Sequence, residues 1–158
     1  MTLQRVLLAL VLTESLVVGL AGSAVAQATP DFHPFAQTWR RHGFGLAVDR
    51  NGYGPAVFRV YKWCSDDPRP PCDRLSRDEI VNGGHADLVF TRIAGSTAFG
   101  AVIASNLSPV LAVKDVSLTL QPYDTAVLRQ GSKTLQLCGP RFEQESPASV
   151  RQTNPCGA

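Results

Sequence analysis

The chain has 158 residues, of which 44% are hydrophobic and only 18% are charged. This length suits one domain and excludes a large multi-site enzyme. A mean hydropathy near zero and a net charge of +2 exclude a disordered chain, because such chains are more polar and more strongly charged. The pI near 8.4 is too mild for a typical nucleic-acid-binding protein, so no nucleic-acid partner is expected.

Residues 1–28 predict a secretory signal peptide. Arg5 precedes an apolar run at residues 6–12, and small-x-small cleavage patterns follow at residues 24–28. Glu14 interrupts the apolar sequence and argues against a retained membrane anchor, because a charge in the bilayer centre costs at least about 2 kcal/mol. We therefore predict that residues 29–158 form a single secreted, extracellular domain with no stable membrane span after cleavage.

The four cysteines agree with that location. Cys64, Cys72, Cys138 and Cys156 all follow the predicted signal peptide, and in an exported protein they predict two disulfides. Three pairings are open, and proximity favours Cys64–Cys72 and Cys138–Cys156, which would contribute roughly 2.5 and roughly 3 kcal/mol. A metal site made of all four thiolates is the alternative, but no Cys-x-x-Cys pair is present. We expect no metal and no cofactor.

The predicted elements are mainly strands, because apolar residues recur at every second position from residue 44 onward. Strands are expected at residues 44–48, 56–63, 86–93, 97–105, 116–120, 126–129 and 134–138. Asn51-Gly52 predicts a turn between the first two strands. The pattern of Ser76 and Glu79 resembles a capping box, which predicts one short helix over residues 77–81. The residues after 138 are expected to be irregular.

Six to eight short strands with one short helix indicate an all-β fold. We predict a single antiparallel barrel with two disulfides, and a β-sandwich is the alternative. Neither internal repeats nor a domain linker is evident in the sequence.

Two resemblances support this reading. Residues 35–39, followed by a glycine-flanked strand and an Asn-Gly turn, resemble the Trp-containing first strand of small calycin-like barrels. The segments at residues 61–64, 70–73, 137–140 and 155–158, each containing one of the cysteines, resemble a family of small secreted actinobacterial proteins of unknown function. That resemblance covers most of the mature chain, and it implies secretion and the cysteine framework but no activity.

Arg59, Tyr61 and Trp63 are the candidate binding residues. They would share one face of the strand expected at residues 56–63, while Phe58 and Val60 occupy the other face. Exposed aromatic side chains beside an arginine are typical of binding surfaces. The alternative is that the Cys64–Cys72 loop or the C-terminal tail covers this face and makes it a second small core.

Other polar groups are interpreted as solvated surface. The acidic side chains between residues 66 and 79 offer oxygen ligands for calcium, but interleaved arginines oppose a cation. His33, His42 and His85 lie in separate segments, so a zinc site has no support. The basic run Arg40-Arg41-His42 is treated as surface rather than as an anion site.

The sequence predicts a secreted, non-catalytic binding protein of unknown ligand. The ligand would be either a small apolar molecule in a barrel mouth or an extracellular protein on the Tyr61 and Trp63 face. One alternative is an extracellular enzyme inhibitor that presents the disulfide-constrained loop 64–72 as a rigid insert. Another is a hydrolase assembled from distant loops, although no nucleophile elbow and no recognisable carboxylate pair is present. No catalytic residue is therefore named.

Overall fold

The computed structural model describes residues 30–112, 114–153 and 155–157. The predicted signal peptide at residues 1–28 lies outside these residues.

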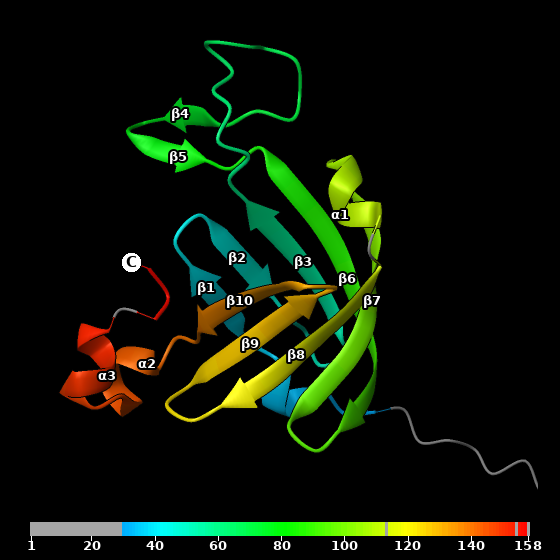
Figure 1. Cartoon of the computed structure of the whole chain (residues 1–158), viewed down its shortest axis with the longest axis vertical. Helices are drawn as coiled ribbons and strands as arrows, with labels where there is room; N and C mark the ends of the chain where they lie inside the picture. The colour runs from blue at the N-terminus through cyan, green and yellow to red at the C-terminus, as the bar shows by residue number, and fades with distance from the viewer. Residues whose placement is uncertain (1–29, 113, 154, 158) are drawn as a thin grey trace, which may run out of the picture.

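Eight antiparallel strands close into a barrel, which confirms the predicted all-β fold and selects the barrel over the sandwich (Figure 1). The barrel strands are β1 (Thr38–Arg41), β2 (Phe44–Ala47), β3 (Tyr53–Phe58), β6 (Gly84–Ala94), β7 (Thr97–Ser105), β8 (Asp115–Gln121), β9 (Thr125–Gln130) and β10 (Lys133–Cys138). Their order around the wall is β1-β10-β9-β8-β7-β6-β3-β2. Period-two alternation directs every second side chain into the interior. Accordingly, Val116 and Leu118 of β8 are buried while Ser117 is only half-buried.

One end of the barrel is closed by its own aromatic side chains. A short 3₁₀ turn, η1 (His33–Phe35), precedes β1, and the buried Trp39 indole N–H donates to the Phe35 carbonyl at 3.0 Å. Phe32 packs edge-on against Phe35. Gly52 has φ +84°, and a Cβ there would lie 2.8 Å from the Phe32 ring, so the turn before β3 requires a glycine. Each fully buried aromatic contributes about 1.5–3 kcal/mol.

The helix predicted over residues 77–81 is wrong. The chain instead forms a small hairpin of β4 (Arg74–Ser76) and β5 (Glu79–Val81), which stands apart from the barrel wall (Figure 1). Arg77 and Asp78 occupy its turn with φ of 49° and 66°. Left-handed φ at both central residues is the geometry of a tight hairpin turn, and it is incompatible with a helix at that point.

Two further expectations need correction. The strand predicted over residues 56–63 ends at Phe58, and Tyr61 has a left-handed φ of 58°. The expected irregular C-terminal region contains two short helices, α2 (Phe142–Glu145) and α3 (Ala148–Gln152). One more short helix, α1 (Ser108–Ala112), connects β7 to β8.

Both disulfides have the favoured pairing, Cys64–Cys72 and Cys138–Cys156. A thiolate metal site is therefore wrong, and the bonds are compatible with an oxidising compartment. The second disulfide lies at the strand junction with the fewest paired residues, because β1 and β10 share only the pair Arg40 and Cys138. The His42 amide donates to the Cys156 carbonyl at 2.8 Å, so the tail also holds the turn after β1. Among the described residues, no helix is long and apolar enough to cross a membrane.

Candidate ligand-binding site at the barrel mouth

A cavity of about 440 Å³ opens at the end of the barrel opposite η1, and we call it the mouth cavity. Its volume lies within the usual range of small-molecule sites. The wall is mainly apolar and includes Phe44, Phe58, Leu88, Val102, Leu128 and Leu135. Phe44 and Phe58 are paired across β2 and β3, and their rings stack at 6.5 Å between centroids.

Helix α1 lies against this end of the barrel. Its Val110 and Leu111 are half-buried against the core, and Val110 lines the mouth cavity. The Gln130 side-chain amide donates to the Val110 carbonyl at 2.6 Å, which fixes the helix to β9. Aromatic residues thus close one end of the barrel, and the apolar recess lies at the other end, beside the short helix.

The polar lining of the mouth cavity is basic or neutral. It consists of Arg41, His42, Arg59, Tyr61, Gln130 and Lys133. None of the described lining residues is an aspartate or a glutamate. A cavity of this composition accepts an apolar body and tolerates negative charge at its rim.

The three candidate binding residues lie together, although not on one strand face. The Arg59 guanidinium carbon lies 5.0 Å from the Tyr61 ring centroid and 5.0 Å from the Trp63 ring centroid. Arg59 and Tyr61 line the mouth cavity, whereas Trp63 does not. Tyr61 is 70% exposed, so its ring is available at the rim.

The buried carboxylate of Asp73 organises this corner. Its side chain is fully buried and accepts hydrogen bonds from the Arg59 Nε and the backbone amides of Val60, Tyr61 and Gly83, at 2.8 to 3.2 Å. Burial opposes ionisation, but the hydrogen bonds from Gly83, Arg59, Val60 and Tyr61 outweigh it and hold the pKa of Asp73 below its ordinary value. The interpretation of Asp73 as a solvated loop residue is therefore wrong.

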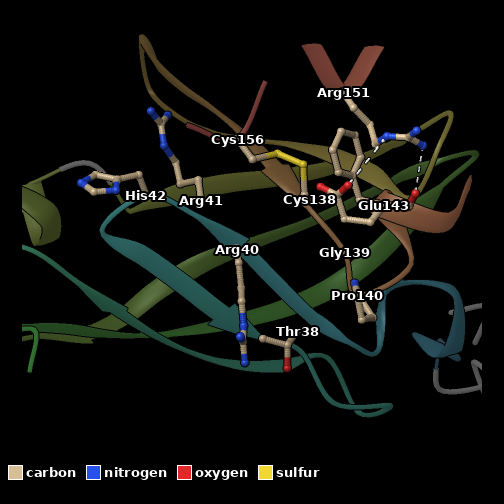
Figure 2. Close-up of a pocket in the computed structure, with 11 residues that line it drawn as sticks. Thr38, Arg40, Arg41, His42, Cys138, Gly139, Pro140, Glu143, Arg151 and Cys156 are labelled. Carbon is tan, nitrogen blue, oxygen red and sulfur yellow. Dashed lines mark hydrogen bonds and ion pairs between the residues drawn. A yellow bond between two sulfur atoms is a disulfide. The ribbon is translucent and has the colours of Figure 1, made fainter. Parts of the chain in front are cut away.

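A second hollow lies outside the barrel, beside the β1–β10 junction. It has a volume of about 670 Å³, and we call it the seam groove. Figure 2 shows Arg41 and His42 on one side of the Cys138–Cys156 disulfide, and Arg151 with Glu143 on the other.

The cations of the seam groove are partly engaged. Arg151 donates to the backbone carbonyls of Glu143 and Ser146 at 3.1 and 2.5 Å, and it forms an ion pair with the Glu143 carboxylate at 3.8 Å. The seam groove thus lies between the barrel and the C-terminal helices, whose Glu143 and Arg151 form one of its sides.

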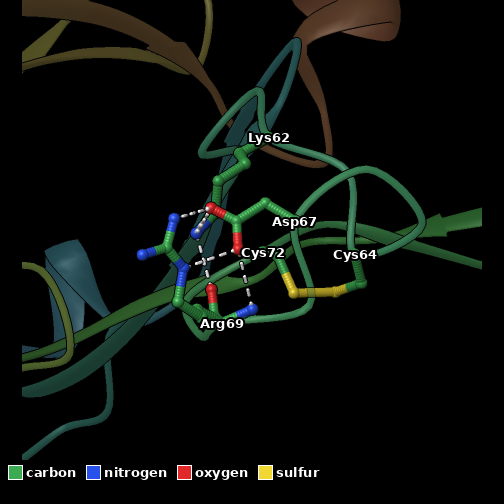
Figure 3. Close-up of polar contacts among 5 residues, drawn as sticks. All are labelled: Lys62, Cys64, Asp67, Arg69 and Cys72. Carbon is green, nitrogen blue, oxygen red and sulfur yellow. Dashed lines mark hydrogen bonds and ion pairs between the residues drawn. A yellow bond between two sulfur atoms is a disulfide. The ribbon is translucent and has the colours of Figure 1, made fainter.

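The Cys64–Cys72 loop is braced by its own charges. The Asp67 carboxylate accepts hydrogen bonds from Nε and Nη2 of Arg69 at 2.9 and 2.8 Å, and it lies 3.6 Å from the Lys62 amine (Figure 3). The hydrogen bonds from Arg69 lower the pKa of Asp67 to about 2. The loop is thus exposed but internally ordered, with Ser65, Asp66, Pro68 and Pro70 facing solvent.

The histidines do not form a site. His33 lies in η1, His42 in the turn after β1, and His85 on the outward side of β6. Asp87, which shares a face with His85, accepts a hydrogen bond from the Tyr53 hydroxyl at 2.7 Å, and this bond raises the pKa of Tyr53. Among the described residues, no group of three His, Cys, Asp or Glu side chains is placed to hold a metal ion.

The sequence reasoning missed Arg41 and Lys133 as residues of the mouth cavity. The spacing of two was a usable signal, because residues two positions apart share a strand face: Arg41 lies two positions after the apolar Trp39, and Lys133 two positions before the apolar Leu135. The chain matches no protein-family model, no curated protein and no solved structure.

Proposed function

We propose that the protein is a secreted, non-catalytic binding protein that takes a small apolar molecule into the mouth cavity. The observation that carries the proposal is an apolar recess of about 440 Å³ at the open end of a barrel whose other end is filled by Trp39, Phe32 and Phe35. The interior of an eight-stranded barrel is either filled by side chains or holds one small ligand, and the open recess favours the second arrangement. The expected resemblance to calycin-like barrels is consistent with this use.

Native mass spectrometry tests the proposal directly. Protein purified from its source should carry a mass above that of the doubly oxidised chain, and the excess should be lost on denaturation. Recombinant protein should bind dodecanol, a neutral apolar probe. A bare mass together with no binding of dodecanol would contradict the proposal.

A matched pair of variants locates the site. Ala86 is 3% exposed and lines the mouth cavity, so Ala86→Phe should fill it and abolish dodecanol binding. Ala104 is exposed on β7 and is not among the cavity residues, so Ala104→Phe makes the same chemical change on the outer wall. Retained binding in the first variant, or equal loss in both, would place the ligand elsewhere.

A second candidate function is inhibition of an extracellular enzyme by the Cys64–Cys72 loop. Its support is the exposure of most of residues 65–71, combined with the disulfide and the Asp67–Arg69 contacts, which preorganise the loop. Preorganisation lowers the entropy cost of binding. Scrambling residues 65–71, with both cysteines kept, should then abolish partner binding while the fold persists. Unchanged binding after scrambling would remove this candidate.

A further inference from the structure

Two barrel strands, β1 and β10, place a basic side chain on their inward-facing side at the mouth of the barrel. On β1, Trp39 is buried and Arg41 occupies the same face two residues later. On β10, Leu137 is buried, Leu135 is half-buried, and Lys133 continues that face. Both cations line the mouth cavity. Interior positions that are apolar at the closed end therefore become basic at the open end.

These two cations have no acidic partner within the described chain. No carboxylate among the described residues lies within ion-pair distance of Arg41 or Lys133. Arg59, which also lines the cavity, is by contrast bound to Asp73 at 2.9 Å. A positive charge beside a low-dielectric wall exerts a stronger field than the same charge on open surface.

Resting on the proposed function, we infer that the mouth cavity selects a single-chain amphiphile with a carboxylate head group. The apolar chain lies against the wall formed by residues such as Leu88, Val102 and Leu128. The carboxylate is held at the rim by Arg41 and Lys133, where charge-assisted hydrogen bonds are roughly twice as strong as neutral ones. A cationic head of the same size would be repelled.

Three probes that share one alkyl chain and differ in head group measure the contribution of the head group to affinity. Affinities for dodecanoic acid, dodecanol and dodecylamine are measured by isothermal titration at neutral pH. The acid should bind roughly tenfold more tightly than the alcohol, which corresponds to one charge-assisted contact. The amine should bind more weakly than the alcohol.

Variants assign the selectivity to named residues. Lys133→Gln and Arg41→Gln should each lower the affinity for the acid by a larger factor than the affinity for the alcohol. Lys133→Glu should reverse the order of acid and amine, and this reversal keeps the test decisive if Arg41→Gln does not fold. Arg129→Gln is the matched control, because Arg129 is exposed on the outward side of β9 and is not among the cavity residues.

The outcomes of these measurements test the head-group selectivity separately from the proposed binding function. Tighter binding of the acid that is lost in Lys133→Gln and kept in Arg129→Gln supports the inference. Equal binding of acid and alcohol, or the same loss in the control, overturns the inference and leaves the proposed function standing. No binding of any of the three probes, together with a bare native mass, overturns both.

Discussion

Replacing Asp73 tests whether its buried carboxylate stabilises the backbone around residues 59–61 and Gly83. Replacing Asp73 by Asn keeps the shape of the side chain and removes its charge. The amide oxygen can still accept from Val60 and Gly83. Its NH₂ group, however, then faces two donors, the Tyr61 amide and the Arg59 Nε, each 2.9 Å from Asp73 Oδ2.

The magnitude follows from these contacts. Two hydrogen bonds to a charged acceptor are lost, at about 1.5–3 kcal/mol each. Arg59, whose side chain is only 12% exposed, is left without its counter-ion. Removing one partner of a buried pair costs about 3–5 kcal/mol. We therefore expect Asp73→Asn to lower the free energy of unfolding by about 3–5 kcal/mol and the Tm by roughly 10–20 °C.

Urea unfolding followed by tryptophan fluorescence measures this change, with the free energy extrapolated linearly to water. Asp67→Asn is the control, because it removes a carboxylate from the Cys64–Cys72 loop, which ends one residue before Asp73. Asp67 lies at the surface, where water screens its ion pairs, so the control should unfold at nearly the same urea concentration as the unaltered protein. A loss for Asp73→Asn no larger than the loss for Asp67→Asn would refute the reasoning.

Three more predictions follow from the geometry. Folding depresses the pKa of Asp73, so the stabilisation by its ionised carboxylate is complete above the unfolded pKa of about 4 and is lost as the pH falls below that value. The urea midpoint of unfolding should therefore drop below about pH 4, and it should drop less steeply in Asp73→Asn. Replacing Cys138 and Cys156 together by Ala should cost roughly 3 kcal/mol in the same urea assay, and no change would mean that the tail is held by other contacts. Trp39→Phe removes the indole hydrogen bond to Phe35, so a loss of about 1–2 kcal/mol is expected, and an unaltered unfolding midpoint would contradict the role of that bond.

The barrel strands were predictable because their signal is local. The alternation in residues 97–105 and 134–138 depends only on neighbours in the chain, and the structure places β7 and β10 there with bounds within one residue. Disulfide pairing was predictable for the same reason, since each cysteine pairs with its nearest neighbour in sequence.

The errors lie where distant residues decide the backbone. The strand predicted over residues 56–63 stops at Phe58, and the Tyr61 amide donates to the Asp73 carboxylate, 12 residues later in sequence, rather than to a neighbouring strand. The β4–β5 hairpin needs left-handed φ at Arg77 and Asp78, and neither residue is a glycine that would announce such a turn. Gly83 at its far end also donates to Asp73. The Asp73 carboxylate therefore contacts the backbone both beyond the end of β3 and beyond the β4–β5 hairpin.

The sequence contained most of the candidate site but not its location. Tyr61 and Arg59 were selected for their composition, and they do line the mouth cavity. Arg41 and Lys133 were passed over, because a basic residue at the end of a strand normally faces water. Which face of β1 and β10 turns inward depends on barrel closure, and closure is a property of the whole chain.

The single-pair junction between β1 and β10 has a consequence for the order of folding. Strands β6 to β10 are each adjacent to their neighbour in sequence, so their pairing closes only short loops. Pairing β1 with β10 joins the first and last strands of the chain that the structure describes, and it forms one residue pair, Arg40 with Cys138. Such non-local contacts form late. The Cys138–Cys156 bond lies entirely on the C-terminal side, so oxidation can fix β10 to the tail before β1 arrives. The barrel then closes when β1 pairs with β10, a strand that the disulfide has already joined to the C-terminal tail.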